Sequence, residues 1–303
     1  MAAFTAKDVQ LLREKTGCGM MDCKKALTEA EGSMDKAMEL LREKGLAAAS
    51  KKAGRIAADG MVHAVVEGNV GVIVEVNSET DFVAKNADFQ AFVDAVARTV
   101  AARNPADVEA LAAMKLSGSE MTVEEALRDK ILVIGENLKI RRFARYEGVV
   151  STYIHGGGRI GVMARFDADA GTAAKAEFQS FAKDVAMQVA AAGPQYLCKE
   201  EVPQDVVGKE KEILTAQAIN EGKAPQIAEK MVNGRIQKFY KEVCLLEQPY
   251  VKNGDISVTQ YVEETAKALG GSIKVLEFVR YEKGEGLEKR EDNFADEVAG
   301  MMK

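Results

Sequence analysis

The chain has 303 residues, of which 47% are apolar and 29% charged, a composition typical of a folded protein with two or three hydrophobic cores. Its net charge of −6 argues against broad, sequence-independent binding of nucleic acid, because such binding needs a basic surface. With four cysteines outside any CxxC spacing and only two histidines, the sequence favours neither a structural zinc site nor a disulfide framework.

Two features of the sequence bear on where the protein works. It contains no apolar run of about 18 residues that could cross a membrane. Its first residues, Met-Ala-Ala-Phe-Thr-Ala-Lys, lack the apolar core of a signal peptide. We therefore expect a cytoplasmic protein that does not associate with a membrane.

Residues 5–45 predict three short helices. Thr5 and Asp8 have the spacing of a capping box, so a first helix begins there and ends near Gly17. A second helix begins around Met21, and a third ends at Gly45. Apolar residues recur at helical spacing in all three: Val9, Leu12, Ala26, Leu27, Met34, Ala37, Met38 and Leu41. A small helical bundle is expected.

Residues 47–60 are mostly small, which is typical of a linker. A basic cluster of Lys51, Lys52 and Arg55 lies within it. We therefore assign a first domain, a three-helix bundle with its basic linker, to residues 1–54.

A β-hairpin followed by a helix is expected next. Gly68 and Asn69 predict a two-residue turn, after which residues 72–76 alternate as in a strand. From Asn86 the period changes, and apolar residues fall on one helical face: Phe89, Phe92, Val93, Val96, Ala97 and Val100. Residues 80–83 therefore lie between a strand and a helix, in an expected loop.

Phe82 in this loop fits neither periodic pattern, and the acidic Asp81 precedes it. One interpretation is that Phe82 is a local core residue that plugs the fold. The other is that it is an exposed apolar wedge with a carboxylate beside it, able to enter another protein.

The rest of the chain contains an internal repeat. Residues 70–73 recur as 160–163, residues 89–92 as 178–181, and residues 143–147 as 278–282. Each half therefore predicts a hairpin, a helix, a connection, a helix and a strand. That order gives an α+β fold in which helices cover one face of an antiparallel sheet. We place the two halves at residues 55–147 and 148–282.

The repeat also separates the shared scaffold from what is specific to one half. Opposite residues 80–83, the second half has only small or polar residues, at 169–172. A phenylalanine required by the shared fold should have an apolar counterpart, and Phe82 has none. This difference favours the wedge.

The second half carries a long insertion. The first half joins its two helices through residues 103–120, whereas the second uses residues 193–254. Segments 200–215 and 225–243 are charged and helix-prone, which predicts an antiparallel helical hairpin within residues 200–246. We expect most of its apolar residues to hold the two helices together: Val206, Ile213, Ile227, Met231, Ile236 and Phe239. A C-terminal helical module is expected over residues 283–303, with its helix at 293–301.

No motif of bond chemistry is present. The sequence HGGGRIG at residues 155–161 formally contains GxGxxG, but a dinucleotide loop leads into a helix and a strand follows here. The GxSxG of esterases and the GxxxxGK[ST] of P-loop nucleotidases are both absent. We expect a glycine-rich hairpin turn, no catalytic residue, no cofactor and no metal site. His63 lies on a strand without an expected chemical neighbour, and we assign it no role.

Two segments resemble a known family. Residues 75–85, EVNSETDFVAK, and residues 12–27, LREKTGCGMMDCKKAL, are similar to the most characteristic segments of elongation factor Ts, the nucleotide exchange factor of bacterial elongation factor Tu. The resemblance covers essentially the whole chain. It implies a ubiquitin-associated-like N-terminal domain and guanine nucleotide exchange during translation elongation, without bond chemistry or direct binding of nucleic acid. The implied partner is elongation factor Tu, GDP-bound and nucleotide-free, and the helical hairpin is implied as a surface for the partner, for a homodimer or for a 2:2 complex.

The resemblance also implies the residues that contact elongation factor Tu. Thr80, Asp81, Phe82 and Val83 are expected near the Mg²⁺ and phosphate site of the partner, where Asp81 and Phe82 displace the ion. Further contact positions are matched by Arg13, Met20, Met21, Lys24, Lys52 and His155. From the residues alone, a methionine pair is more often part of a core than of an interface, and the other four fit solvated side chains.

Two other classes of function stay open on the residues alone. A ubiquitin-associated-type binding module with a structural body would bind partners without altering nucleotide release. An enzyme would need clustered histidines, cysteines or carboxylates at a cleft, and the sequence shows no such cluster.

Overall fold

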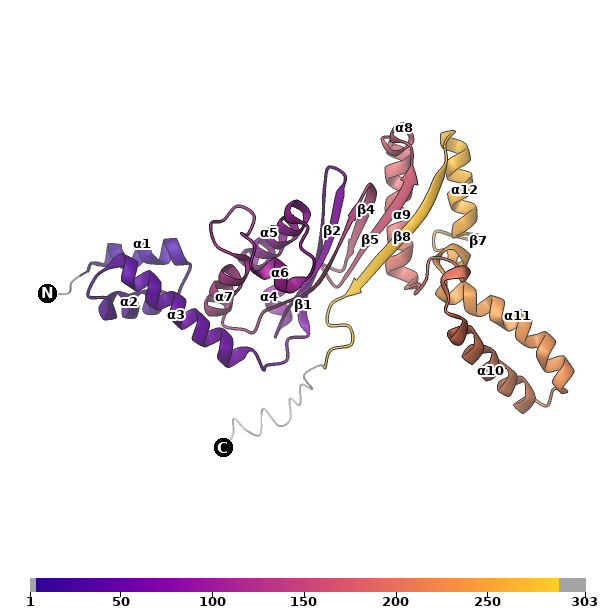
Figure 1. Cartoon of the computed structure of the whole chain (residues 1–303), viewed down its shortest axis with the longest axis horizontal. Coiled ribbons are helices and arrows are strands. Elements are labelled where there is room, and N and C mark those ends of the chain that lie inside the picture. Colours follow the sequence, from indigo (N-terminus) through magenta and orange to yellow (C-terminus); the bar gives the residue numbers. More distant parts are fainter. Residues whose placement is uncertain (1–3, 289–303) are drawn as a thin grey trace.

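The computed structural model describes residues 4–288 and shows an elongated molecule (Figure 1). A helical bundle lies at the N-terminal end, two sheets with their helices form the middle, and a helical hairpin projects at the other end. The helix expected at residues 293–301 lies outside the described residues. None of the helices within residues 4–288 is long and apolar enough to cross a membrane.

The N-terminal bundle consists of α1 (Ala6–Thr16), α2 (Met20–Glu29) and α3 (Met34–Lys52). The predicted capping box is present, because Thr5 Oγ1 accepts from the Asp8 amide and the Asp8 carboxylate accepts from the Thr5 amide. Gly17 ends α1 in the left-handed region, at a φ of 67°. The bundle core contains Val9, Leu12, Cys18, Cys23, Ala26, Leu27, Ala37 and Leu41. The three predicted helices are confirmed.

The predicted end of the third helix at Gly45 is wrong. α3 continues to Lys52, through a leucine and three alanines that favour a helix. Gly45 is buried where α3 meets α7 (Val123–Ile134), and a Cβ there would lie 3.8 Å from the Arg128 carbonyl oxygen. Gly45 therefore marks a helix–helix contact, and the linker is limited to residues 53–58.

The first half contains an antiparallel sheet in the order β1-β2-β3, formed by β1 (Asp59–Glu67), β2 (Val70–Ser78) and β3 (Lys139–Glu147). The predicted turn at Gly68 and Asn69 is confirmed, because Glu67 pairs with Val70. Its helices are α4 (Asp81–Ala84), α5 (Ala87–Arg103), α6 (Val108–Ala112) and α7. The core between sheet and helices includes Val72, Val74, Val76, Phe89, Phe92, Val93, Val96, Ala97 and Val100.

The second half repeats this plan. Its sheet has the order β4-β5-β8, formed by β4 (Val149–His155), β5 (Ile160–Ala168) and β8 (Ile273–Glu282), with helices α8 (Ala170–Ala173), α9 (Ala176–Ala192) and α12 (Val258–Leu269). The registers match, because Ile73 pairs with Ala144 in one sheet and Met163 with Val279 in the other. The predicted repeat and the α+β class are confirmed.

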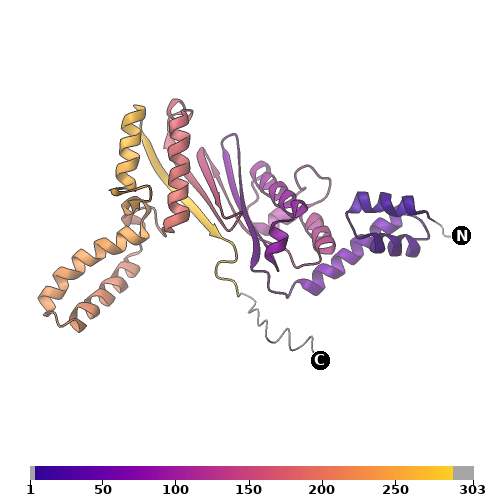
Figure 2. The same ribbon diagram turned by 180° about the vertical axis from the view of Figure 1, so that it is seen from behind.

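The sheet faces that carry no helices pack against each other, so the helices of each half lie on the outside (Figures 1 and 2). Two glycines permit this close approach. A Cβ on Gly71 would lie 2.4 Å from Val150 Cγ1, and one on Gly161 would lie 2.4 Å from Val62 Cγ1. The residues buried between the sheets are Val62, Ile73, Met163 and Tyr281. The sequence analysis assigned helices to one face and gave the other no partner.

The insertion forms the expected antiparallel hairpin, of α10 (Gln204–Asn220) and α11 (Pro225–Val243). It is flanked by η1 (Lys199–Glu201), η2 (Leu245–Glu247), β6 (Pro249–Tyr250) and β7 (Asn253–Ser257). The bounds of α11 are as predicted, whereas α10 begins after Pro203, four residues later than predicted. Ile236 is buried as expected, but Ile213 and Ile227 are 52% and 54% exposed, so the expected seam is wrong for these two.

The N-terminal bundle packs beside α5 and α7 rather than on the equivalent helices α9 and α12 (Figure 1). In the first half, Ala91, Ala95 and Leu132 line the crevice next to the bundle. The repeat places Ser180, Asp184 and Lys267 at these positions. The second surface is therefore more polar than the first, and covering it would remove polar and charged side chains from water, which is unfavourable.

A buried carboxylate fastens the end of β8 to the first half. Glu75 is fully buried, and its oxygens accept hydrogen bonds from four donors. These are Asn77 Nδ2 at 3.0 Å, Arg141 Nη1 at 3.0 Å, the Gly284 amide at 2.8 Å and Arg142 Nε at 2.6 Å. The segment after β8 is thus bound to β2 and β3 through one side chain.

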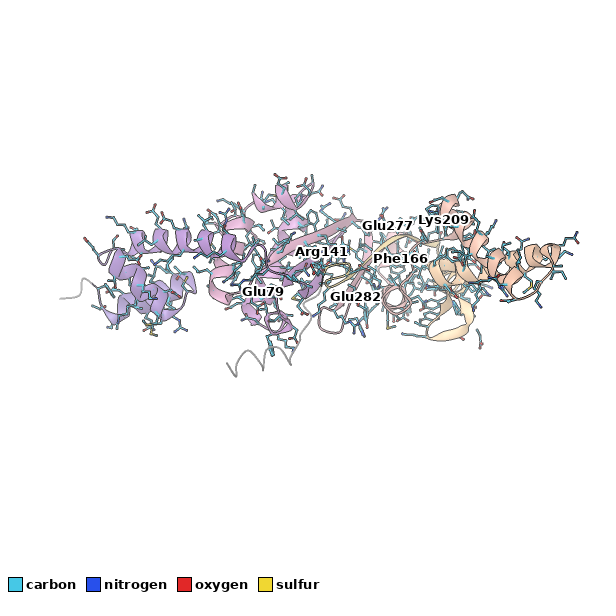
Figure 3. All side chains as sticks on the ribbon, turned by 90° about the horizontal axis from the view of Figure 1, so that it is seen from below. Glu79, Arg141, Phe166, Lys209, Glu277 and Glu282 are labelled. Carbon is cyan, nitrogen blue, oxygen red and sulfur yellow. The ribbon has the colours of Figure 1, made fainter. Side chains whose placement is uncertain are left out.

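The same cluster continues along residues 282–285. Arg142 Nη2 donates to the Glu282 carbonyl oxygen at 3.3 Å and to the Glu285 carboxylate at 3.1 Å. Arg141 and Glu282 mark this junction in Figure 3. Burial acts to raise the pKa of Glu75, but the hydrogen bonds from Gly284, Asn77 and Arg142 outweigh it and hold the pKa below the ordinary value. Glu75 is therefore ionised at neutral pH.

Replacing Glu75 by glutamine should lower the free energy of unfolding at neutral pH by about 3 kcal/mol, because Arg141 and Arg142 lose their buried anion. Urea-induced unfolding followed by circular dichroism measures this loss. It should be full above pH 4.5, the ordinary pKa of glutamate. The difference should shrink as the pH falls through the lower pKa of the folded state, because the wild-type carboxylate is then also neutral.

The matched control is Glu277→Gln, the carboxylate of the equivalent ladder pair in the second half, where Glu277 takes the position of Arg142 and Arg165 that of Glu75. There Arg165 Nε donates to Glu277 Oε1 at 2.6 Å, but the two side chains are 35% and 40% exposed. We expect this variant to lose less than about 1 kcal/mol. Equal losses in the two variants would contradict the role assigned to Glu75.

Candidate functional site

The segment expected as a loop at residues 80–83 is the start of a one-turn helix. Thr80 is the N-cap of α4, and Asp81, Phe82 and Val83 form its first turn. The turn forms here because Val83 is buried against the core of the first half, with 6% of its surface exposed. Asn86 then caps α5 by accepting from the amides two and three residues ahead.

Phe82 is 76% exposed, so the interpretation of a core plug is wrong. Asp81 beside it is exposed as well, and Lys85 Nζ donates to its Oδ2 at 3.1 Å. The same ammonium lies 5.6 Å from the centroid of the Phe82 ring. The hydrogen bond from Lys85, together with the Lys85 charge, holds the pKa of Asp81 below its ordinary value. The turn therefore presents an aromatic ring and an ionised carboxylate side by side.

The turn is held by a carboxylate from far along the chain. Glu136, in the loop between α7 and β3, accepts from the Glu79 amide at 3.0 Å and from the Thr80 amide at 2.9 Å. Its other oxygen accepts from Thr80 Oγ1 at 2.7 Å. In return, Glu79 Oε1 accepts from the Asn137 amide at 2.6 Å. We call this set of Glu79, Thr80, Glu136 and Asn137 the turn clamp.

The second half builds the equivalent turn without a clamp. Asp169 caps α8 locally, because its carboxylate accepts from the Thr172 amide at 2.9 Å and from Thr172 Oγ1 at 2.7 Å. Thr172 is buried at 3% exposure, as Val83 is in the first half. The position of Phe82 is taken by Gly171. The shared scaffold thus requires a buried residue in this turn, Val83 or Thr172, but does not require a phenylalanine at the position of Phe82.

The turn clamp was not predicted from the sequence, although one signal was present in the spacing of the repeat. Ser78 and Ala168 follow equivalent ladder pairs, because Asn77 pairs with Lys139 of β3 and Asp167 with Lys274 of β8. Thr80 follows Ser78 after one intervening residue, whereas Asp169 follows Ala168 directly. Glu79 is therefore an insertion relative to the repeat. Glu136 gives no comparable signal, because its bonds to Thr80 join residues 56 positions apart.

Four of the other predicted contact residues meet at one hollow. Met20 and Met21 at the start of α2 are 57% and 61% exposed, so their interpretation as core residues is wrong. They line a hollow of about 1120 Å³ together with Arg13 and Lys24. α1 forms a second wall, and Asp88 of α5 reaches it from the first half. Flexible thioethers beside two cations make this hollow suited to an apolar and acidic protein surface.

Lys52 and His155 lie apart from this hollow. Lys52 Nζ donates to the Ile131 carbonyl oxygen at 3.3 Å and so fastens α3 to α7. His155 is exposed at the end of β4, where its Nδ1 lies 3.2 Å from Tyr153 Oη. His63, which we expected to have no chemical neighbour, lies with Nε2 3.0 Å from Asp94 Oδ1, and that expectation is wrong.

The glycine-rich turn joins β4 to β5 as predicted and packs on the first half. Gly158 is buried, and a Cβ there would lie 2.8 Å from Met61 Cβ. Its carbonyl oxygen accepts from the Val62 amide at 2.8 Å. Within the part of the chain that the structure describes, no three or more His, Cys, Asp or Glu side chains are grouped to hold a metal ion.

Comparison with known proteins agrees with the resemblance of the two segments. The family model described as "Elongation factor TS" matches residues 79–285. The chain is 55% identical to the elongation factor Ts of Clostridium botulinum (strain Eklund 17B / Type B) over 304 aligned residues, with 99% of each chain covered. It is 52% identical to that of Clostridioides difficile (strain 630), with 100% of each covered, and 49% identical to that of Syntrophotalea carbinolica, with 99% of each covered.

The different burial of two neighbours gives a test of the scaffold. Phe82→Ala should change the free energy of unfolding by less than about 0.5 kcal/mol, because the ring is exposed. Val83→Ala should lower it by about 2 kcal/mol, because it opens a cavity under α4. Thermal unfolding of the two single variants measures both changes. A larger loss for Phe82→Ala than for Val83→Ala would show that the ring is part of the core.

Proposed function

The chain belongs to the elongation factor Ts family, and from this membership we propose that it is a guanine nucleotide exchange factor for elongation factor Tu. It binds the partner in its GDP-bound and nucleotide-free states and promotes release of GDP, so that GTP can bind during translation elongation. It acts in the cytoplasm and makes or breaks no covalent bond. The observation that carries the finer part of the proposal is the exposed Phe82, on a turn whose repeat counterpart has a glycine.

Exchange requires differential binding. The factor must bind nucleotide-free elongation factor Tu better than the GDP complex. The coupling is reciprocal, so GDP lowers the affinity of the factor for elongation factor Tu as much as the factor lowers the affinity for GDP. Each tenfold loss of nucleotide affinity needs about 1.4 kcal/mol of such differential binding. A contact that the factor makes only with the nucleotide-free state supplies this differential binding free energy.

Phe82 and Asp81 make that contact. The Phe82 ring enters between helices of the partner and shifts the elements that hold Mg²⁺. Asp81 brings a negative charge towards the same region, which disfavours the ion and the phosphates together. Because the tightly held nucleotide depends on Mg²⁺ and on backbone donors around its phosphates, the loss of either contact speeds its release.

The rest of the chain supplies affinity. The bundle at residues 1–54 anchors the partner through Arg13, Met20, Met21 and Lys24. Residues 55–147 carry the turn at Thr80 to Val83, and Lys52 and His155 add contacts at the margins. Residues 148–282 and the C-terminal module at 283–303 extend the interface into the class above roughly 2,000 Å².

The helical hairpin is assigned to assembly. Ile213 and Ile227 are exposed on α10 and α11, which supports a contact with a second protein surface there. In this proposal the hairpin joins two copies as a homodimer or as a 2:2 complex with elongation factor Tu. Because the hairpin lies at the end of the molecule away from α4 (Figure 1), such a contact leaves the α4 turn free.

Replacing Asp81 and Phe82 together by alanine should lower the maximal rate of GDP release by about a hundredfold or more, while binding of elongation factor Tu is partly retained. Stopped-flow release of a fluorescent GDP at rising concentrations of factor gives the plateau rate and the half-saturating concentration separately. The reason for the drop is that the variant keeps the anchoring surfaces and loses the contact specific to the nucleotide-free state.

The matched variant is Met20→Ala combined with Met21→Ala, which removes two exposed side chains outside the turn. It should raise the half-saturating concentration by about tenfold and leave the plateau rate unchanged. A plateau rate that survives the loss of Asp81 and Phe82 would overturn the wedge. Binding of the wild-type chain without any acceleration would overturn exchange itself.

A further inference from the structure

We propose that Glu136 is a positioning residue for nucleotide exchange: it fixes the α4 turn in the orientation in which Phe82 and Asp81 meet the partner. This inference rests on the proposed exchange function and adds to it a residue outside the segment of the family motif. Glu136 lies in the loop between α7 and β3, 54 positions from Phe82, and it touches neither Phe82 nor Asp81 by hydrogen bond.

The α4 turn is too short to fix its own direction. α4 spans only Asp81–Ala84, and a helix of one turn is not stable on its own. Its N-cap, Thr80, makes no side-chain capping bond to α4. The hydroxyl of Thr80 donates instead to Glu136. The direction of α4 is therefore set from outside the turn.

Glu136 holds the segment before α4 with both of its carboxylate oxygens. Both carboxylate oxygens are used, one by the amides of Glu79 and Thr80 and the other by the Thr80 hydroxyl. Three charge-assisted bonds to two consecutive residues fix both position and rotation of the segment that leads into Phe82. The Asn137 amide, which donates to Glu79 Oε1, closes the clamp from the same loop.

The second half has no carboxylate at the position of Glu136. The repeat places Gly271 opposite Glu136, and a Cβ there would lie 2.4 Å from Thr172 Oγ1. That half leaves no space for a clamping side chain and caps α8 locally with Asp169. Folding of the turn thus does not need a carboxylate at this loop. Of the two equivalent turns, the one that carries the exposed ring is the one held by this carboxylate.

The consequence is a rigid presentation of Phe82. An exposed ring on a loosely held turn would lose conformational freedom on entering the partner, and that loss would reduce the differential binding available for exchange. A clamped turn has already lost this freedom. Removing the clamp should therefore lower the plateau rate of GDP release more than it raises the half-saturating concentration.

Two substitutions separate reach from charge. Glu136→Asp keeps the charge but withdraws the carboxylate by one methylene, so we expect the plateau rate to fall by about tenfold. Glu136→Gln loses the charge but keeps the reach, because its oxygen can accept from both amides and its NH₂ group can donate to the Thr80 hydroxyl. We expect this variant to stay within about threefold of the wild type.

The experiment is stopped-flow release of fluorescent GDP from elongation factor Tu, with hydrogen exchange of the Glu79 and Thr80 amides as a second readout. Exchange at these amides should be faster in Glu136→Asp than in Glu136→Gln. The control is Glu125→Ala, which removes the carboxylate that caps the other end of α7 and should leave the plateau rate unchanged.

The outcomes distinguish the two proposals. No acceleration by the wild-type chain would overturn the exchange function. Acceleration by the wild type together with an unchanged plateau rate in Glu136→Asp would overturn only the positioning role. Hydrogen exchange of the Glu79 and Thr80 amides that is no faster in Glu136→Asp than in the wild type would also overturn it, because the carboxylate would then not hold the turn.

Discussion

The packing of two sheets through Gly71 and Gly161 determines where everything else lies. Because neither glycine has a side chain, the helix-free faces of the two halves meet, and Val62, Ile73, Met163 and Tyr281 are buried between them. The helical layers are thereby left on the outside, and with them the α4 turn and Phe82. Glu75 adds the second link, since its buried carboxylate binds residues 282–285 to the first half. The α4 turn and Phe82 thus lie on a body whose two halves are joined by buried apolar and ionic contacts.

Duplication explains how one scaffold acquired a function in one of its halves. The ladder position of Glu75 is occupied by Arg165 in the second half, and the position of Arg142 by Glu277, so the charges are exchanged while the register is kept. The local cap at Asp169 is likewise replaced by the turn clamp of Glu79 and Glu136. The scaffold is kept in both cases, and in the second the local interaction of Asp169 with Thr172 is replaced by one between residues 56 positions apart. The first half therefore carries interactions that the second half does not repeat, and one of them, the turn clamp, holds the segment that leads into Phe82.

Local and repetitive features of this fold could be predicted from the sequence. The capping box of α1, the Gly68-Asn69 turn, α11 and the repeat depend on residues close together or on the agreement of two copies, and these predictions are confirmed. Contacts between distant segments could not be predicted. Gly45 was taken as a helix end because its contact with α7 is invisible in the sequence, and Glu136 was missed because it lies 56 positions from Thr80. Residues 80–83 were expected to be a loop because a helix of one turn has no periodicity to detect.

In the proposed function, nucleotide exchange depends on the difference between the two halves at one turn. The most direct test converts the first turn into the second by combining Thr80→Asp, Asp81→Ala, Phe82→Gly, Val83→Thr and Glu136→Gly, with Glu79 deleted. Its stability, its binding to elongation factor Tu and the rate of GDP release are then measured side by side. We expect a folded protein that still binds elongation factor Tu but accelerates GDP release less than about one hundredth as well as the wild type. Release at the wild-type rate would contradict it and would place exchange in surfaces that the two halves share.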